Sequence, residues 1–149
     1  MTNRKRLTDT IMKPRIEKKT LIKIIGINLT LFLLLVGLIY INKTIFRPTF
    51  NENYLAQILT GSFPNFIAAF LISLCAVNPV LIRRPRLGRL IVYLGSLLIM
   101  TALILDELES IGASKQYDIY DIAGSIIGAL LAVLTFEYLN YRQKRKKDI

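Results

Sequence analysis

Hydrophobic residues in this chain are gathered into four long runs, which are separated by shorter polar stretches. The runs cover about residues 24–41, 63–82, 90–105 and 119–139. Each is close to the roughly 17–25 apolar residues with which an α-helix crosses the hydrocarbon core of a bilayer. The pattern therefore predicts an all-α protein, a membrane helix bundle with four transmembrane helices.

Polar residues at both ends of the chain divide it into three parts. We expect a basic tail at residues 1–20, a transmembrane domain at 21–141 and a second basic tail at 142–149. Within the second run, Ser62 and Pro64 predict the start of a helix, because serine is a good N-cap and proline suits the first turn. Asn78-Pro79 predicts a break near the end of that run. The first run is too long for the core of a signal peptide, so we interpret it as an uncleaved anchor.

Positive charge is distributed very unevenly among the polar stretches. The chain has a net charge of +10, and its Lys and Arg residues are concentrated in the two tails and in residues 83–89. Because Lys and Arg near a membrane span stay on the cytoplasmic side, both termini are predicted to be cytoplasmic. The two loops predicted on the outer side carry most of the acidic residues, namely Glu52, Asp106, Glu107, Glu109, Asp118 and Asp121.

The basic segments predict contact with the anionic headgroups of the bilayer at its cytoplasmic face. They hold no aromatic or groove-entering element, so we expect no nucleic acid as a partner. The chain has no histidine and a single cysteine, Cys75, which removes the usual zinc and haem ligand sets. We therefore expect no cofactor and no metal. A metal, if bound, would have to be a hard cation held by carboxylates.

Three carboxylates near the predicted outer side form a candidate functional cluster: Glu107, Asp118 and Asp121. Glu107 falls at the carboxyl end of the third run, where the helix dipole disfavours negative charge. Asp118 and Asp121 fall at the start of the fourth run, where the dipole favours them and they can cap free amides. If the helix ends are neighbours, the three could bind a divalent cation, relay protons or polarise a hydroxyl. Simple helix capping by the two aspartates is the alternative.

Small residues recur every four positions in the fourth run, at Gly124, Gly128 and Ala132. This spacing places them on one face of a helix and lets a second helix approach closely. We interpret the face as packing within the chain, with homodimerisation as the less favoured alternative.

The end of the chain resembles the closing motif of VanZ-like integral membrane proteins. The resemblance is carried by the run Tyr-Asp-Ile-Tyr-Asp-Ile-Ala at residues 117–123, followed by Gly124 and Gly128, with Glu107 at the upstream acidic position. Residues 61–66 resemble the segment that opens an earlier helix of the family. The chain departs from the family at Ser110, where glutamine is common, near Gly124-Ser125, where an asparagine is common, and in lacking the histidine of an earlier helix. The similarity spans roughly residues 61–134.

The resemblance implies a small, multi-pass protein of the bacterial cytoplasmic membrane. It further implies an accessory factor of the cell envelope with a role in low-level resistance to glycopeptide antibiotics, teicoplanin in particular. Envelope lipids or a membrane protein would then be its partners.

Two alternatives remain open on the residues themselves. One is a membrane-embedded enzyme that acts on an envelope lipid through Glu107, Asp118 and Asp121. The other is a small structural or interaction subunit of a membrane complex. The residues leave open whether the chain is an enzyme.

Overall fold

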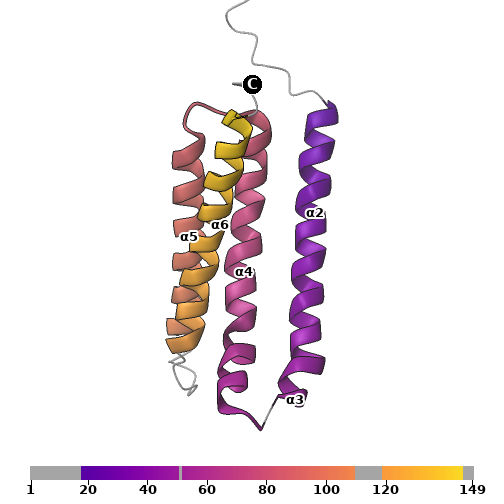
Figure 1. Cartoon of the computed structure of the whole chain (residues 1–149), viewed down its shortest axis with the longest axis vertical. Coiled ribbons are helices and arrows are strands. Elements are labelled where there is room, and N and C mark those ends of the chain that lie inside the picture. The colour runs from indigo at the N-terminus through magenta and orange to yellow at the C-terminus, as the bar shows by residue number, and fades with distance from the viewer. Residues whose placement is uncertain (1–17, 51, 110–118, 146–149) are drawn as a thin grey trace, which may run out of the picture.

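The computed structural model describes residues 18–50, 52–109 and 119–145, and these ranges contain helices and no strand. The helices are α2 (Lys18–Ile41), the π-helical η1 (Asn42–Phe46), α3 (Arg47–Thr49), α4 (Tyr54–Arg83), α5 (Gly88–Glu109) and α6 (Ile119–Arg145). The long helices run side by side and alternate in direction (Figure 1). Four helices, the first of them continuing through η1 and α3, are long and apolar enough to cross a membrane. The prediction of an all-α, four-span membrane protein is confirmed.

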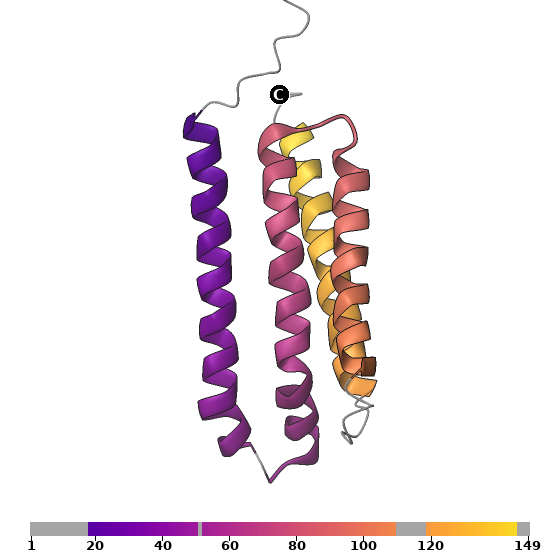
Figure 2. The same cartoon turned by 180° about the vertical axis from the view of Figure 1, so that it is seen from behind.

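Three of the long helices form a close group, and the first stands to one side of it. Helices α4, α5 and α6 contact one another, whereas α2 contacts α4 alone among the long helices that are described (Figure 2). One apolar cluster joins the group of three at one end and consists of Val77, Val80, Val92 and Phe136. A second cluster joins α2 to α4 and is built on Leu35, Ile67 and Leu71. Helix α4 is therefore the central element of the bundle.

The second long helix begins earlier than the sequence pattern predicts. It starts at Tyr54, and Asn53 is its N-cap, with the side-chain oxygen accepting a hydrogen bond from the backbone N–H of Leu55 at 3.0 Å. Ser62 lies inside the helix, where its hydroxyl donates to the carbonyl of Ile58 at 3.0 Å. The predicted start at Ser62 is wrong because Asn53 supplies an equally good cap about two turns earlier.

The predicted break at Asn78-Pro79 is also wrong, since α4 continues through Pro64 and Pro79 to Arg83. A proline inside a helix lacks the N–H that would bond to the carbonyl four residues earlier. The carbonyls freed in this way are those of Thr60 and Cys75. In a membrane such groups need another donor, because no water is present to supply one.

Side-chain amides from the first helix supply these donors. The Asn42 amide donates to the Thr60 carbonyl at 2.8 Å, and the Asn28 amide donates to the Cys75 carbonyl at 3.3 Å. Asn78 completes the contact by donating to the side-chain oxygen of Asn28 at 2.8 Å. The α2–α4 interface thus compensates for both prolines, which explains why the helix is unbroken.

The small residues of α6 are buried and lie where this helix meets α4. A Cβ atom added at Gly128 would overlap the carbonyl oxygen of Phe66, and one added at Gly124 would lie 2.9 Å from the carbonyl oxygen of Ser62. Ala132 is fully buried on the same face. The two backbones are therefore close enough that neither glycine position has room for a side chain.

Charged residues separate to the two ends of the bundle. The start of α2, the turn between α4 and α5 and the end of α6 lie at one end and carry most of the described Lys and Arg (Figure 1). The opposite end carries Glu52, Asp106, Glu107 and Asp121. This separation matches the alternation of charge along the sequence. Which end faces the cytoplasm stays a prediction.

Candidate functional site, a basic pocket at one end of the bundle

The acidic residues singled out from the sequence are only partly covered by the structure. Glu107 lies near the end of α5, and Asp121 lies in the first turn of α6, at the same end of the bundle. Asp118 falls outside the described residues. Within the described ranges, no group of three or more His, Cys, Asp and Glu side chains is arranged to hold a metal ion. The cluster of Glu107, Asp118 and Asp121 therefore stays a prediction, and so does the enzyme based on it.

A different site lies at the opposite end, where α4 turns into α5. Arg84 ends α4 in the left-handed conformation, with φ 50° and ψ 54°, and its backbone N–H donates to the carbonyl of Val80 at 2.8 Å. Pro85 follows, and a residue before proline is disfavoured in the right-handed helical region, so the helix ends here. Gly88 begins α5, and a Cβ atom there would lie 2.8 Å from a methyl group of Val80. The turn therefore packs tightly and places its arginines beside the last turns of α6.

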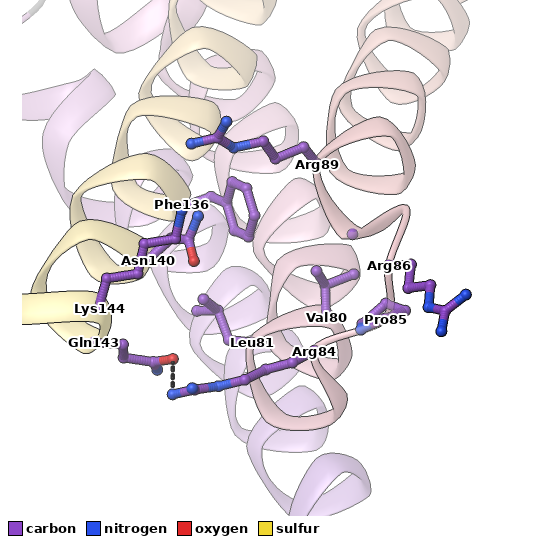
Figure 3. Close-up of a pocket in the computed structure, with 11 residues that line it drawn as sticks. Val80, Leu81, Arg84, Pro85, Arg86, Arg89, Phe136, Asn140, Gln143 and Lys144 are labelled. Atoms are coloured by element: carbon purple, nitrogen blue, oxygen red, sulfur yellow. Dashed lines mark hydrogen bonds between the residues drawn. The ribbon is translucent and has the colours of Figure 1, made fainter. Parts of the chain in front are cut away.

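The turn and the end of α6 enclose a pocket of about 410 Å³ (Figure 3). One side of the pocket is lined by the apolar side chains of Val80, Leu81 and Phe136. Four cationic side chains also line it, from Arg84, Arg86, Arg89 and Lys144, with the amides of Asn140 and Gln143 between them. The described residues that line the pocket include no Asp or Glu. The pocket is therefore strongly basic.

Two of the arginines are held by partners on α6. The Arg84 guanidinium crosses to α6 and donates to the side-chain carbonyl of Gln143 at 2.7 Å (Figure 3). The Arg89 guanidinium lies on the side of the pocket near Phe136, whereas Arg86 points away from the other cations (Figure 3). Arg84 and Arg89 thus approach the pocket from opposite sides.

Glu137 of α6 holds Arg89 just beyond the pocket. One of its carboxylate oxygens lies 3.1 Å from the Arg89 guanidinium, and the other accepts a hydrogen bond from the Tyr93 hydroxyl at 2.7 Å. The Arg89 side chain is 60% exposed and that of Glu137 is 32% exposed. An ion pair this exposed stabilises the fold by at most about 1 kcal/mol. Its main consequence is to orient Arg89 while the charges of Arg84 and Lys144 stay available.

From the sequence, these basic residues predict topology and contact with anionic headgroups, but they do not predict the pocket. A usable signal was present, because residues 83–89 and 142–147 are predicted on the same side of the membrane and could meet there. The pairing of Arg89 with Glu137 has no local signal, since it depends on how α5 and α6 are aligned.

The pocket is suited to binding an anion. Guanidinium groups match the oxygen geometry of a phosphate, and a lysine adds a compact positive charge. Its described lining supplies guanidinium and ammonium groups together with the neutral amides of Asn140 and Gln143. No protein-family model, curated protein or solved structure matches this chain.

Proposed function

We propose that this chain is a non-catalytic accessory protein of the bacterial cell envelope, which holds anionic lipid headgroups at its basic end within the cytoplasmic membrane. The observation that carries the proposal is the pocket lined by Arg84, Arg89 and Lys144 at the end of a bundle of membrane-spanning length. The proposal includes the predicted orientation, with both termini and the pocket on the cytoplasmic side.

The location of the pocket supports a lipid headgroup as its occupant. Basic pockets between transmembrane helices on the cytoplasmic side bind anionic headgroups, and each Lys or Arg near an anionic leaflet contributes about 1 kcal/mol. Arg84 comes from the α4–α5 turn and Lys144 from α6, so a phosphate between them would connect the two elements. A soluble protein would offer such a pocket to any anion, whereas here the lipid headgroups are already concentrated at that depth.

The envelope role is supported by the resemblance to VanZ-like proteins at residues 117–128 and Glu107. The role in glycopeptide resistance comes from the same resemblance. Lipid binding and resistance belong to one proposal. They are nevertheless tested separately.

A pair of matched variants tests lipid binding. Arg84→Gln with Lys144→Gln removes two charges from the pocket, and Arg83→Gln with Arg145→Gln removes two charges next to them in sequence that do not line it. We expect the pocket variant to bind phosphatidylglycerol about thirtyfold more weakly, because two charges worth about 1 kcal/mol each are lost, and the control variant to bind it as the wild type does. Native mass spectrometry of the purified protein, titrated with the lipid in detergent, measures both.

Two outcomes would contradict the proposal. In the first, both double variants weaken binding equally, which means that only overall charge matters. In the second, the wild type binds phosphatidylcholine as well as phosphatidylglycerol. Circular dichroism of each variant verifies that the helical bundle is intact.

Teicoplanin susceptibility tests the envelope role. We expect deletion of the chain to lower the inhibitory concentration of teicoplanin, and we expect the wild type and the Arg83/Arg145 control, but not the pocket variant, to restore it. Unchanged susceptibility on deletion would remove the resistance role and leave lipid binding unaffected.

A further inference from the structure

A second hollow lies between α5 and α6, in the part of the bundle that faces the bilayer. It has a volume of about 220 Å³, and its lining is almost entirely apolar. Ser96 and Ala129 are buried in it, while Tyr93, Leu97 and Leu130 are exposed at its edges. The small size of Ser96 and Ala129 creates the hollow, because larger side chains at these two positions would fill it. We call it the α5–α6 groove.

The groove and the basic pocket lie next to each other along the same pair of helices. On α5, Arg89 lines the pocket, and Tyr93, four residues further on, lines the groove. Four residues of α-helix correspond to about 6 Å along the axis. On α6, Phe136 lines the pocket and Val133 lines the groove. The two hollows are thus about one helical turn apart.

Glu137 marks the boundary between the two hollows. Its carboxylate binds Arg89 of the pocket and Tyr93 of the groove, at 3.1 Å and 2.7 Å. Along α5 and α6 the lining therefore changes from the cations of the pocket, through the Arg89–Glu137 ion pair, to the apolar residues of the groove within about one turn. An anionic lipid has the same sequence of properties, with a charged phosphate followed by a hydrocarbon chain.

We propose that the basic pocket and the α5–α6 groove form one site for an anionic lipid, with the phosphate beside Arg84, Arg89 and Lys144 and one hydrocarbon chain in the groove. This inference rests on the proposed function and adds the requirement that the bound lipid carries a hydrocarbon chain. The charge complementarity at one end and the apolar lining at the other commit the groove to such a lipid. A soluble phosphate would leave the groove empty, and a zwitterionic lipid would leave the cations without a matching net charge.

The first test varies the length of the lipid's hydrocarbon chain and uses the wild-type protein. Palmitoyl phosphatidylglycerol, octanoyl phosphatidylglycerol and glycerol phosphate share the anionic group and differ in what they can place in the groove. We expect the palmitoyl lipid to bind about fivefold more tightly than the octanoyl lipid at equal mole fraction in micelles, because only the longer chain makes the full set of dispersion contacts. Glycerol phosphate should bind most weakly. Equal binding of the two lipids would overturn the inference.

Filling the groove gives the second test. Ala129→Leu should reduce binding of the palmitoyl lipid to the level of the octanoyl lipid and leave octanoyl binding unchanged. Ser96→Leu fills the groove from α5 and replaces the first variant if that one does not fold. Ala102→Leu is the matched control, because Ala102 is an exposed residue of α5 that does not line the groove. Wild-type binding of the palmitoyl lipid by a folded groove variant would overturn the inference.

The outcomes separate this inference from the function on which it rests. Loss of binding in the Arg84/Lys144 variant, together with no effect of the groove variants, would retain headgroup binding and exclude the groove. No effect of the Arg84/Lys144 variant would remove both. If the groove variants instead convert a dimer into a monomer, a second copy of the chain occupies the groove and the inference fails.

Discussion

Helix α4 is held by its two neighbours in different ways. Against α6 it makes a tight interface, where Gly124 and Gly128 bring the two backbones together and a Cβ atom would meet a main-chain oxygen. Against α2 and the η1 segment that follows it, Leu35 packs on Ile67 and Leu71, and the side-chain amides of Asn28 and Asn42 donate to carbonyl groups of α4. One interface requires the absence of side chains, and the other requires particular ones.

The difference teaches how helices associate without a hydrophobic driving force. Lipid tails are as apolar as leucine, so helices in a bilayer are held together by close packing and by hydrogen bonds. The α4–α6 interface relies on close packing of the backbones, whereas the α2–α4 interface adds side-chain hydrogen bonds to its apolar packing. We therefore expect added side-chain volume to destabilise mainly the α4–α6 interface, and the loss of a hydrogen-bond donor to destabilise mainly the α2–α4 interface.

Gly128→Ala should have the largest effect on stability. Its Cβ atom would overlap the Phe66 carbonyl oxygen and lie 3.0 Å from the Phe70 backbone nitrogen, so the two backbones must move apart. We expect a loss of about 3 kcal/mol, the upper end of the range for overpacked sites. Unfolding by SDS in mixed micelles, followed by circular dichroism, measures it. Gly95→Ala is the control, since its Cβ atom would make an ordinary contact of 3.5 Å with Ala76. A similar cost at both positions would mean that the close approach does not matter.

Gly124→Ala should have a smaller effect in the same direction. The nearest atom to its Cβ would be the Ser62 carbonyl oxygen at 2.9 Å, followed by the Phe66 backbone nitrogen at 3.3 Å. A movement of a few tenths of an ångström relieves this contact, so we expect a loss of about 1–2 kcal/mol. The same unfolding measurement applies. A larger loss than at Gly128 would contradict the geometry of the interface.

The α2–α4 interface should be sensitive to the loss of a donor only where a proline requires one. Asn28→Ala removes the bond to the Cys75 carbonyl that Pro79 leaves free, and we expect it to cost about 1 kcal/mol. In a Pro79→Ala background, residue 79 regains its N–H and bonds to that carbonyl within α4. The cost of Asn28→Ala should then fall by about 0.6 kcal/mol.

A double-mutant cycle with Asn28 and Pro79 measures this coupling. Asn28 also accepts a hydrogen bond from Asn78, so part of its cost should persist in the Pro79→Ala background. A cycle with no coupling would show that the Asn28 amide does not compensate for the proline. Asn42→Ala in the same two backgrounds is the control, because the Asn42 amide donates to the Thr60 carbonyl, which Pro64 and not Pro79 leaves free.

The fold was largely predictable from the sequence. The errors of that prediction concern the two prolines of α4. Runs of membrane-spanning length identify four helices without any partner, because each helix satisfies its own backbone. Pro64 and Pro79 gave the wrong start and the wrong break because local rules assume that a freed carbonyl goes without a donor. The donors Asn28 and Asn42 lie far away in sequence, and their contact follows from the register of two helices.

The candidate site was much less predictable. The sequence assigned Arg84 and Arg89 to topology and to general contact with anionic headgroups, which is what their position in the chain indicates, and it did not predict a pocket. Their meeting with Lys144 and Glu137 depends on the alignment of α6 against the α4–α5 turn. Glu107 stood out among the acidic residues because it conflicts with the helix dipole, and its cluster with Asp118 and Asp121 stays a prediction because Asp118 lies outside the described residues.

Gly37→Ala should have almost no effect on stability, which makes it the most sensitive test of the contrast between the two interfaces. A Cβ atom at Gly37 of α2 would meet no atom within 4 Å, and the same holds at Gly26. We expect both variants to lie within about 0.5 kcal/mol of the wild type, since alanine favours a helix slightly and no contact opposes it. SDS unfolding of the purified protein measures this.

The comparison with Gly128 then becomes informative about α2 in a membrane. If Gly37→Ala is neutral in the isolated chain but lowers its abundance in cells, we expect another helix to pack against that face of α2, because no described residue lies within 4 Å of the added Cβ atom. Such a result would support an interaction subunit over a self-sufficient bundle. Neutrality in both settings would mean that lipid alone surrounds this face, and that glycines in this chain are restrictive only where α6 meets α4.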